Sequence, residues 1–359
     1  MIRLKDIAER AGVTATTVSK VLRDAPDISA ETKARIRQIA ESLGYVPDSG
    51  AQSLRSKKTH MLGVLISAVT DPFSSRVLLG LEEKASEFKF DLLLAQTFND
   101  PQKELAAIER FMSRRVDGFI ISPVHRFAER VPVYEELLRL EIPTVIIGPV
   151  PNWASRFVSV ETDNLEASEK ITKHLISLGH KKIAFLAGPS FSPAYKARLD
   201  GYRKALRDSG IQCNDSLVVL AGTTIEEGYQ AMTSAYAELK DVTAIAAVND
   251  SVAVGAVQFL IKNKFRVPQD VSVVGFGNYL ISEYGQVRLT TVRQPKYRLG
   301  LAAIDMINQL LSKKQVSPLV LPSELLIRES TAPPPTQTIQ VPVYQNQFMA
   351  QSMQQQATL

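Results

Sequence analysis

The 359-residue sequence is poor in the residues and patterns that several protein classes require. It contains one cysteine, Cys213, and four histidines that are scattered along the chain. A single cysteine excludes an internal disulfide framework and a cysteine-based zinc site. The sequence also has no apolar run of about 18 residues, as a membrane span needs, and no hydrophobic core of a secretory signal. We therefore expect a cytoplasmic protein that neither spans a membrane nor is exported, and that uses no metal or cofactor.

Enzyme signatures are missing as well. The sequence shows no phosphate-binding loop, no metal-ligand cluster and no nucleophile–base set, and the run GFGN at 275–278 does not match the dinucleotide-binding fingerprint. At 359 residues and 45% hydrophobic content, the chain is long enough for several globular domains. We expect a binding protein rather than an enzyme.

The N-terminal region has the pattern of three short helices. Apolar residues recur at helical spacing over 4–11, and Gly12 is suited to end that helix because glycine adopts the left-handed conformation. Thr14 is a good N-cap for a second helix, and Ser29 is a good N-cap for a third over 30–43. Two short helices joined by a tight glycine turn form a helix-turn-helix. The same pattern also fits other small helical bundles.

Charge favours the DNA-binding interpretation. Residues 1–58 hold eleven Lys or Arg and seven Asp or Glu, so they carry +4 (11 − 7) of the chain's net charge of +5. The rest of the chain is therefore nearly neutral. A positive head on a neutral body is typical of a module that binds nucleic-acid phosphates.

The chain closely resembles the lactose-repressor (LacI/GalR) family of bacterial transcription regulators. The head carries this resemblance in LKDIAERAGVTATTVSKVL, SAETKARIRQIAESLGYVPD and AQSLRSKKT. The body carries it in RRVDGFII, LGHKKIAFLAGP, RLDGYRKAL, VNDSVAVGA, VPQDVSVVGF and LTTVRQP, so that it covers roughly residues 1–330. It implies an α/β fold with an N-terminal helix-turn-helix domain and a periplasmic-binding-protein-like type I body of two doubly wound parallel-sheet subdomains.

The resemblance also implies the function. It predicts a sequence-specific, nucleoid-associated regulator, most simply a repressor, that binds a palindromic operator in double-stranded DNA as a homodimer. A tetramer is left open. The effector is expected to be a small carbohydrate-type molecule. Control by a protein co-regulator, or by a non-sugar effector, is the alternative.

Short apolar runs alternate with amphipathic helices after residue 60, which indicates doubly wound parallel sheets. Helices are expected over 74–88 and 165–178. The expected strands are MLGVLI, DLLLA, GFIIS, PTVIIG, KIAFLAG, TAIAAV and VSVVGF. About a dozen such units are too many for one compact sheet, so we expect two similar subdomains. The resemblance implies that the chain crosses between them three times.

The patterns and the resemblance together give the domain boundaries. We expect a DNA-binding domain over 1–46, a hinge over 47–59, an effector-binding and dimerisation domain over 60–330, and a tail over 331–359. The resemblance implies that the two subdomains cover about 61–160 plus 292–322, and 161–291 plus 323–330. The tail contains no charged residue and is rich in Gln, Pro and Thr, which predicts disorder. A β-like segment that packs on a partner is the alternative.

The resemblance implies which residues contact DNA. The second helix would enter the major groove, where Ala15 and Thr16 touch thymine methyl groups and Lys20 donates to guanine. Leu54 matches a hinge leucine that wedges into the minor groove, although the hinge segment also fits a plain linker. The expected set is Leu4, Thr14, Ala15, Thr16, Thr17, Ser19, Lys20, Leu54 and Arg55.

The effector is expected where the two sheets face each other, because ligands of open α/β sheets bind beyond the carboxyl ends of the strands. The resemblance implies that Arg198 grips ligand hydroxyl or carboxylate groups with its planar fork. The expected set is Asp71, Phe73, Ser74, Ser122, Arg198, Asn249, Asp250 and Gly277.

Two departures from the family pattern bear on the effector. Gly277 and Gly148 stand where many sugar-binding members have aspartates. Carboxylates bind sugar hydroxyls but repel anions, so their loss predicts a sugar acid or a sugar phosphate. His125, Arg126 or Asn278 are the candidates that would otherwise fill the space.

Overall fold

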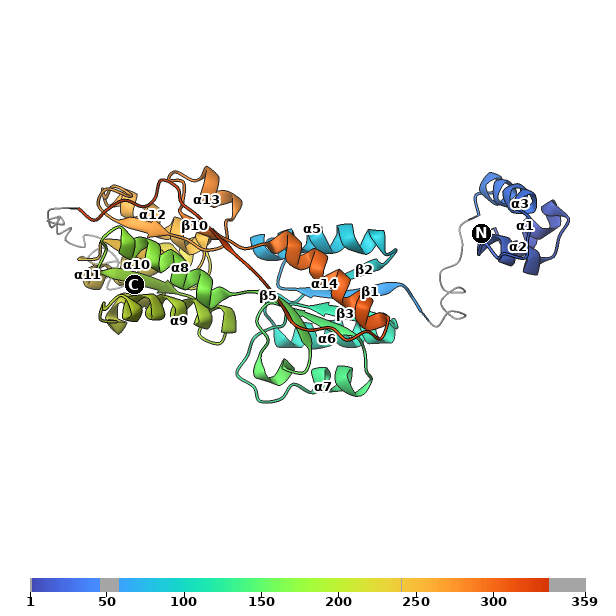
Figure 1. Ribbon diagram of the computed structural model, residues 1–359, viewed down its shortest axis with the longest axis horizontal. Coiled ribbons are helices and arrows are strands. Elements are labelled where there is room, and N and C mark those ends of the chain that lie inside the picture. The colour runs from blue at the N-terminus through green and yellow to red at the C-terminus, as the bar shows by residue number, and fades with distance from the viewer. Residues whose placement is uncertain (1, 46–57, 240, 336–359) are drawn as a thin grey trace, which may run out of the picture. The chain divides into compact units, whose positions relative to one another are not determined.

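The structure is a computed structural model that describes residues 2–45, 58–239 and 241–335 (Figure 1). The chain divides into two compact units, Met1–Thr59 and His60–Leu359, here called the head and the body. The hinge residues Leu54 and Arg55 lie outside the described residues.

The head is the expected helix-turn-helix with a third helix. Its helices are α1 (Leu4–Ala11), α2 (Ala15–Leu22) and α3 (Ala30–Ser42). Gly12 has φ 67° after α1, Thr14 Oγ1 accepts from Thr17 N at 3.2 Å, and Ser29 Oγ accepts from Thr32 N at 3.3 Å. Four side chains form the centre of a small core: Ile7, Val18, Val21 and Ile36, each with no exposed surface. The local stop and start signals in the sequence therefore correspond to real helix ends.

The first lobe of the body is a parallel sheet with strand order β11-β5-β4-β3-β1-β2. Its strands are β1 (Met61–Ile66), β2 (Asp91–Gln96), β3 (Gly118–Ile121), β4 (Thr144–Ile147), β5 (Val158–Thr162) and β11 (Leu319–Leu321). One face packs on α5 (Pro72–Glu87) and α14 (Lys296–Leu311), and the other packs on α6 (Pro101–Ser113) and α7 (Pro132–Arg139). A short 3₁₀ helix, η1 (Asn152–Ala154), follows β4. Figure 1 shows α5 and α14 side by side on their face of the sheet.

The second lobe has a smaller parallel sheet with strand order β7-β6-β8-β9. Its strands are β6 (Ile183–Ala187), β7 (Val218–Leu220), β8 (Ala244–Ala247) and β9 (Ser272–Val274), and η2 (Asp215–Leu217) precedes β7. Its helices are α8 (Asn164–Ser177), α9 (Pro193–Asp208), α10 (Ile225–Ser234), α11 (Tyr236–Leu239), α12 (Asp250–Lys262) and α13 (Leu280–Tyr284). Helices α8 and α9 pack on one face of this sheet and α10 and α12 on the other.

All seven apolar runs that were expected to be strands contain strands, which confirms the doubly wound parallel sheets. Strands β5, β7 and β11 and the short strand over 291–293 were not anticipated. Strand β7 has only three residues and lies at the edge of its sheet, although the sequence carries a signal for it in the apolar run LVVLA at 217–221.

The chain passes between the lobes three times. It leaves the first lobe after β5, returns after β10 (Thr291–Arg293) and leaves again after β11 to form β12 (Glu324–Leu326). Strands β10 and β12 pair antiparallel. These adjacent segments place the start of α14 beside the second lobe, which matters for the site below.

The expectation that the chain is disordered from residue 331 onward is wrong for the first residues of this segment. Thr331 Oγ1 lies 3.1 Å from His174 Nε2, and the carbonyl of Ala332 accepts from His180 Nε2 at 2.8 Å. The backbone of this segment is thus fixed on the second lobe through hydrogen bonds that do not depend on charged side chains, which is why composition did not reveal it. Residues 336–359 lie outside the described residues.

Candidate functional site

The outer face of α2 presents small and hydroxyl-bearing side chains. Val18 and Val21 fix the inner face of α2 in the core of the head, so residues between them and before them point outward. The expected DNA contacts that are exposed or half-buried here are Thr14, Ala15, Thr16, Thr17, Ser19 and Lys20. Leu4 is half-buried at the start of α1 and packs against the same core.

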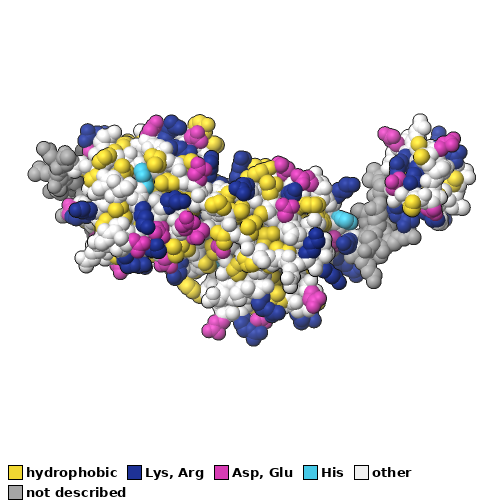
Figure 2. Space-filling model, in the orientation of Figure 1, with side chains coloured by type: hydrophobic (Ala, Val, Ile, Leu, Met, Phe, Trp, Pro, Cys, Tyr) yellow, Lys and Arg dark blue, Asp and Glu magenta, His cyan; other side chains and the backbone are white. Residues whose placement is uncertain are grey.

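Lys20 is engaged within the head. Its Nζ donates to Asp27 Oδ2 at 2.5 Å, and this bond lowers the pKa of the Asp27 carboxyl. The two side chains remain 42% and 52% exposed, so water can replace the contact readily. Lys20 must therefore exchange Asp27 for a base or a phosphate if it contacts DNA. Figure 2 shows Lys and Arg side chains of the head among acidic ones.

In the body, Arg198 of α9 is buried beyond the strand ends of the second lobe. It is 6% exposed, and its Nε donates to Asn164 Oδ1 at 2.9 Å while Nη1 donates to the carbonyl of Val248 at 2.7 Å. The guanidinium carbon lies 3.8 Å from the ring centroid of Phe276 and 5.3 Å from that of Tyr195. Burial lowers the pKa of Arg198, although an arginine stays charged. The guanidinium is thus oriented by neutral partners and aromatic rings.

A second buried cation, Lys296, was missed by the sequence reasoning. It is the first residue of α14, is 7% exposed, and donates from Nζ to the carbonyls of Gly277 and, at 3.4 Å, of Asn278. Nζ lies 5.2 Å from the ring centroid of Tyr279. Burial lowers its pKa to about 8. The only sequence signal was a basic residue directly after the LTTVRQP motif at a crossing between subdomains.

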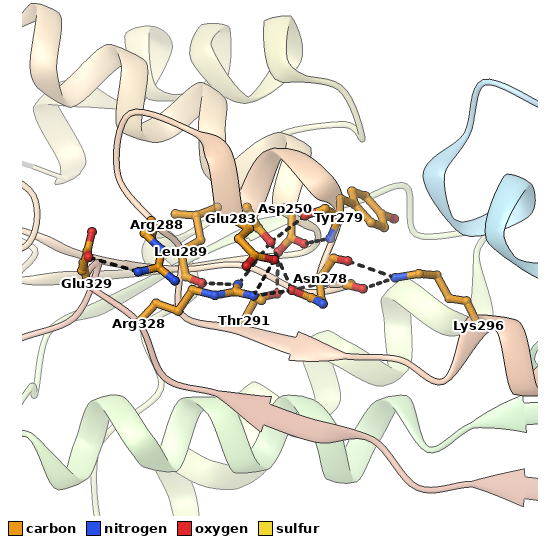
Figure 3. Close-up of polar contacts among 12 residues, drawn as sticks. Asp250, Asn278, Tyr279, Glu283, Arg288, Leu289, Thr291, Lys296, Arg328 and Glu329 are labelled. Carbon is orange, nitrogen blue, oxygen red and sulfur yellow. Dashed lines mark hydrogen bonds and ion pairs between the residues drawn. The ribbon is translucent and has the colours of Figure 1, made fainter.

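Asp250 has a role that differs from the expected one. Its side chain has no exposed surface, and its oxygens accept from Thr291 Oγ1 at 2.5 Å and from Tyr279 N at 2.6 Å (Figure 3). Burial raises the pKa of this carboxyl, whereas the two hydrogen bonds lower it. Asp250 therefore holds the loop that carries Tyr279, and both oxygens of its carboxylate are engaged.

The neighbouring Asn249 is also committed inside the protein. Its Oδ1 accepts from Val252 N at 2.8 Å as the N-cap of α12, and its Nδ2 donates to the carbonyl of Thr223 at 2.9 Å. Only 4% of this residue is exposed. Asn249 and Asp250, the expected polar pair of the second lobe, thus stabilise the strand-end loops from inside the protein.

The structure explains Gly277 without reference to charge. Its φ is +129°, which L residues rarely adopt, and a Cβ atom here would lie 2.6 Å from the ring of Tyr279. Backbone conformation and the Tyr279 ring therefore account for this glycine, and the prediction of an anionic effector from the missing carboxylate stays a prediction. Gly148 also has a positive φ, +96°, but open space lies around its Cβ position.

The first-lobe loop before α5 is built around Asp71. This residue caps α5, accepting from Ser74 N at 2.9 Å and from the Ser74 hydroxyl at 2.7 Å. Ser74 is 3% exposed, and the half-buried Phe73 packs against the lobe core. Ser122, half-buried after β3, donates its backbone N–H to the carbonyl of Leu65. Burial raises the pKa of the Tyr195 and Tyr279 phenols of the second lobe, and Asp71 is close enough to contribute to raising the pKa of each, so the two lobes meet here.

A polar cluster follows β3 and β4 in the same lobe. Arg126 forms an ion pair with the fully buried Glu104, which also accepts from Val124 N and from Tyr134 Oη. The Arg126 guanidinium lies 5.3 Å from the ring centroid of Trp153. The charges of Arg126 and Glu104 cancel, and the pair packs beside the Trp153 ring. Arg126 therefore does not place an uncompensated charge in the space that the missing aspartates leave.

The part of the chain that the structure describes bears on two further features: groups of metal-ligating side chains and long apolar helices. Within residues 2–45, 58–239 and 241–335, no group of three or more His, Cys, Asp or Glu side chains is arranged to hold a metal ion. Over the same residues, no helix has both the length and the apolar character that a bilayer crossing needs.

Two family profiles match the chain over most of its length. The profile described as bacterial regulatory proteins, lacI family, matches residues 3–48. The profile described as periplasmic binding proteins and sugar binding domain of LacI family matches residues 59–329. The match boundaries place one profile on the head and the other on the body.

Individual relatives agree with these matches. The chain is 31% identical to the ribose operon repressor of Escherichia coli (strain K12) over 313 residues, covering 86% of this chain and 92% of the relative. The lac repressor dimer bound to operator and the anti-inducer ONPF is similar in structure, with a TM-score of 0.83, 26% identity, and coverage of 92% and 99%. The complex of the transcriptional regulator CelR with cellobiose gives a TM-score of 0.70, 28% identity, and coverage of 92% and 100%.

Proposed function

Because the chain belongs to the LacI family and is a DNA-binding transcriptional regulator, we propose that it is a cytoplasmic repressor that binds a palindromic operator as a homodimer. The observation that carries the proposal is the outer face of α2, where Thr16 and Lys20 are accessible while Val18 and Val21 anchor the helix. A helix held in this way can enter the major groove of DNA without unfolding.

The proposal assigns a separate function to each segment of the chain. In this proposal residues 1–46 read the operator, 47–59 form a hinge, and 60–330 bind effector and dimerise. Leu54 wedges into the minor groove, and Arg55 contacts the adjacent backbone. This assignment of the hinge rests on the resemblance, because these residues lie outside the described part of the structure.

Exposed apolar side chains support the homodimer. Leu79 of α5 is 54% exposed, and both Leu280 and Tyr284 of α13 are 77% exposed. Figure 2 shows hydrophobic side chains gathered over the part of the body where α5 and α14 lie. Apolar side chains that gather at a surface favour a protein–protein contact. Two copies would give the twofold symmetry that a palindromic operator mirrors.

The effector is proposed to be a small carbohydrate-type molecule with an acidic group, such as a sugar acid or a sugar phosphate. Aromatic rings of Tyr195, Phe276 and Tyr279 accompany the buried cations Arg198 and Lys296 beyond the strand ends. Rings pack on the apolar faces of sugars, and cations favour an anionic group. Solved relatives are described in complex with cellobiose, with ribose and, in one case, with phosphate.

The DNA-binding part is tested by selecting a binding site from random duplexes and measuring anisotropy titrations at several salt concentrations. The expected result is an enriched palindrome whose affinity falls steeply with salt, because Lys and Arg displace counterions from phosphates. Lys20→Ala should cost about 1–3 kcal/mol at one base position. Lys5→Ala, an equal loss of charge on the exposed side of α1, is the matched control.

Two results would contradict the proposal. One is a failure to enrich any palindrome. The other is a Lys20→Ala variant that loses affinity equally on the selected site and on random DNA, since this would make Lys20 a phosphate contact rather than a base contact.

A further inference from the structure

Arg198 and Lys296 are both buried without a carboxylate partner. They are 6% and 7% exposed, and among the described residues no Asp or Glu oxygen lies within 4.0 Å of either cation. Buried charges are normally paired because removal from water costs much more free energy than neutral hydrogen bonds return. The pair of cations therefore constitutes positive charge for which the described residues supply no direct counter-ion.

The nearby acids do not provide that counter-ion. Asp250 is bonded to Thr291 Oγ1 and to Tyr279 N, on the far side of the 277–279 loop from Lys296 (Figure 3). Asp71 is occupied by the N-terminus of α5 and by the Ser74 hydroxyl. From a distance, both carboxylates reduce the free-energy cost of burying the two cations. They leave the N–H donors of Arg198 and Lys296 available.

The partners that Lys296 does have are exchangeable. Its ammonium has three donors, and its contacts are the carbonyls of Gly277 and Asn278, of which the second is long at 3.4 Å. Figure 3 shows the Lys296 side chain extending from the start of α14 to this loop. The bonds from the ammonium to these carbonyls are already charge-assisted, but an anionic acceptor adds a direct attraction between opposite charges that a neutral carbonyl lacks. An anion placed beside Lys296 would thus compete well for its donors.

We propose that Lys296 selects an acidic over a neutral ligand where the two lobes meet, by exchanging the carbonyls of Gly277 and Asn278 for the carboxylate or phosphate group of the ligand. Arg198, held by Asn164 and Val248, serves as the fixed second cation. The inference rests on the proposed function, because it assigns the specificity of the same effector site.

The position of Lys296 links this exchange to the connection between the lobes. Lys296 begins α14 directly after the second crossing, and Asn278 is held by Arg328 from the third crossing, with Nη2 at 2.7 Å from Asn278 Oδ1. Withdrawal of the ammonium therefore removes a contact that ties the start of α14 to the 277–279 loop. The contact of Lys296 that depends on the charge of the ligand therefore lies where the two lobes are joined.

The test uses the full-length protein and four probes at constant ionic strength: D-glucose, D-glucuronate, glucose 6-phosphate and inorganic phosphate. Binding is measured by thermal shift and by calorimetry for wild type, Lys296→Met and Lys296→Arg. Lys314→Met, the same substitution at an exposed site after α14, is the matched control. Glucuronate and glucose 6-phosphate distinguish a carboxylate-bearing from a phosphate-bearing ligand.

The expected result is that at least one acidic probe binds wild type about tenfold more tightly than glucose. Lys296→Met should lose that preference, whereas Lys296→Arg should keep most of it. Equal affinity of wild type for acidic and neutral probes, absence of binding by every acidic probe, or an unchanged preference in Lys296→Met would overturn the proposal. Circular dichroism and operator titration of each variant verify folding. If wild type does not bind the operator, this would instead contradict the proposed function, so the two failures are distinguishable.

Discussion

Lys296 provides a prediction about stability that needs no ligand. The protein without ligand holds this ammonium 7% exposed, and burial lowers its pKa from the ordinary 10.5 to about 8. Asp250 and Asp71 oppose this effect, and Arg76 and Arg198 add to it. The difference between 10.5 and about 8 corresponds to a penalty of about 3 kcal/mol for keeping the charged form in the folded state.

The pH dependence follows from the sign of this change. Below pH 8 the lysine is protonated in both the folded and the unfolded state, so the full penalty applies at neutral pH. Between about pH 8 and 10.5 the unfolded state binds more protons, so the free energy of unfolding rises with pH. Above 10.5 the penalty has disappeared.

The measurement is urea unfolding of wild type and Lys296→Met at pH 7, 8, 9 and 10. Other lysines and tyrosines titrate over this range, so the informative quantity is the difference between the two proteins. We expect wild type to gain about 2–3 kcal/mol relative to the variant from pH 7 to 10. The lost hydrogen bonds to the two carbonyls add a roughly constant offset. A difference that is flat or that falls with pH would refute the reasoning.

Substitutions at three further sites have expected outcomes. Asp27→Asn frees Lys20 and removes a negative charge, so operator affinity in anisotropy titrations should rise about two- to fivefold at low salt and less at high salt; a loss of affinity would contradict this. Arg198→Ala should weaken the best acidic probe at least tenfold in calorimetry yet leave operator binding within about twofold; an unchanged probe affinity would remove Arg198 from the site. Gly277→Asn and Gly277→Asp should both destabilise the body by about 1–3 kcal/mol in urea unfolding, because a side chain at this φ is strained and meets the Tyr279 ring; weaker probe binding by the Asp variant alone would support the charge interpretation.

The sequence was most informative where structure depends on local rules. Gly12, Thr14 and Ser29 act as a stop and two caps through contacts with residues a few positions away, so their roles were predictable. Continuous apolar runs such as those of β1 and β8 identified buried strands for the same reason. The fold class of the head and of the body could therefore be predicted.

The sequence was least informative at the cleft, where roles depend on distant partners. Asp250 is occupied by Thr291, 41 positions away, and Arg126 is neutralised by Glu104, 22 positions away. No local pattern encodes these pairings. Lys296 was missed because its burial arises only when α14 starts beside the second lobe. The φ of Gly277 and its contact with the Tyr279 ring, which account for this glycine without reference to charge, are likewise not visible in a sequence.

The most direct test of the account is an operator titration with and without an acidic ligand. Anisotropy is recorded for the full-length protein on its selected palindrome and on random duplex DNA, at fixed ionic strength, with the tightest acidic probe at saturation. The account predicts that the probe changes operator affinity at least tenfold and leaves binding to random DNA unchanged, since it acts through the body and not through the charges of the head. An operator affinity that is the same with and without every probe that binds the body would contradict the claim that this regulator is controlled by a small acidic effector.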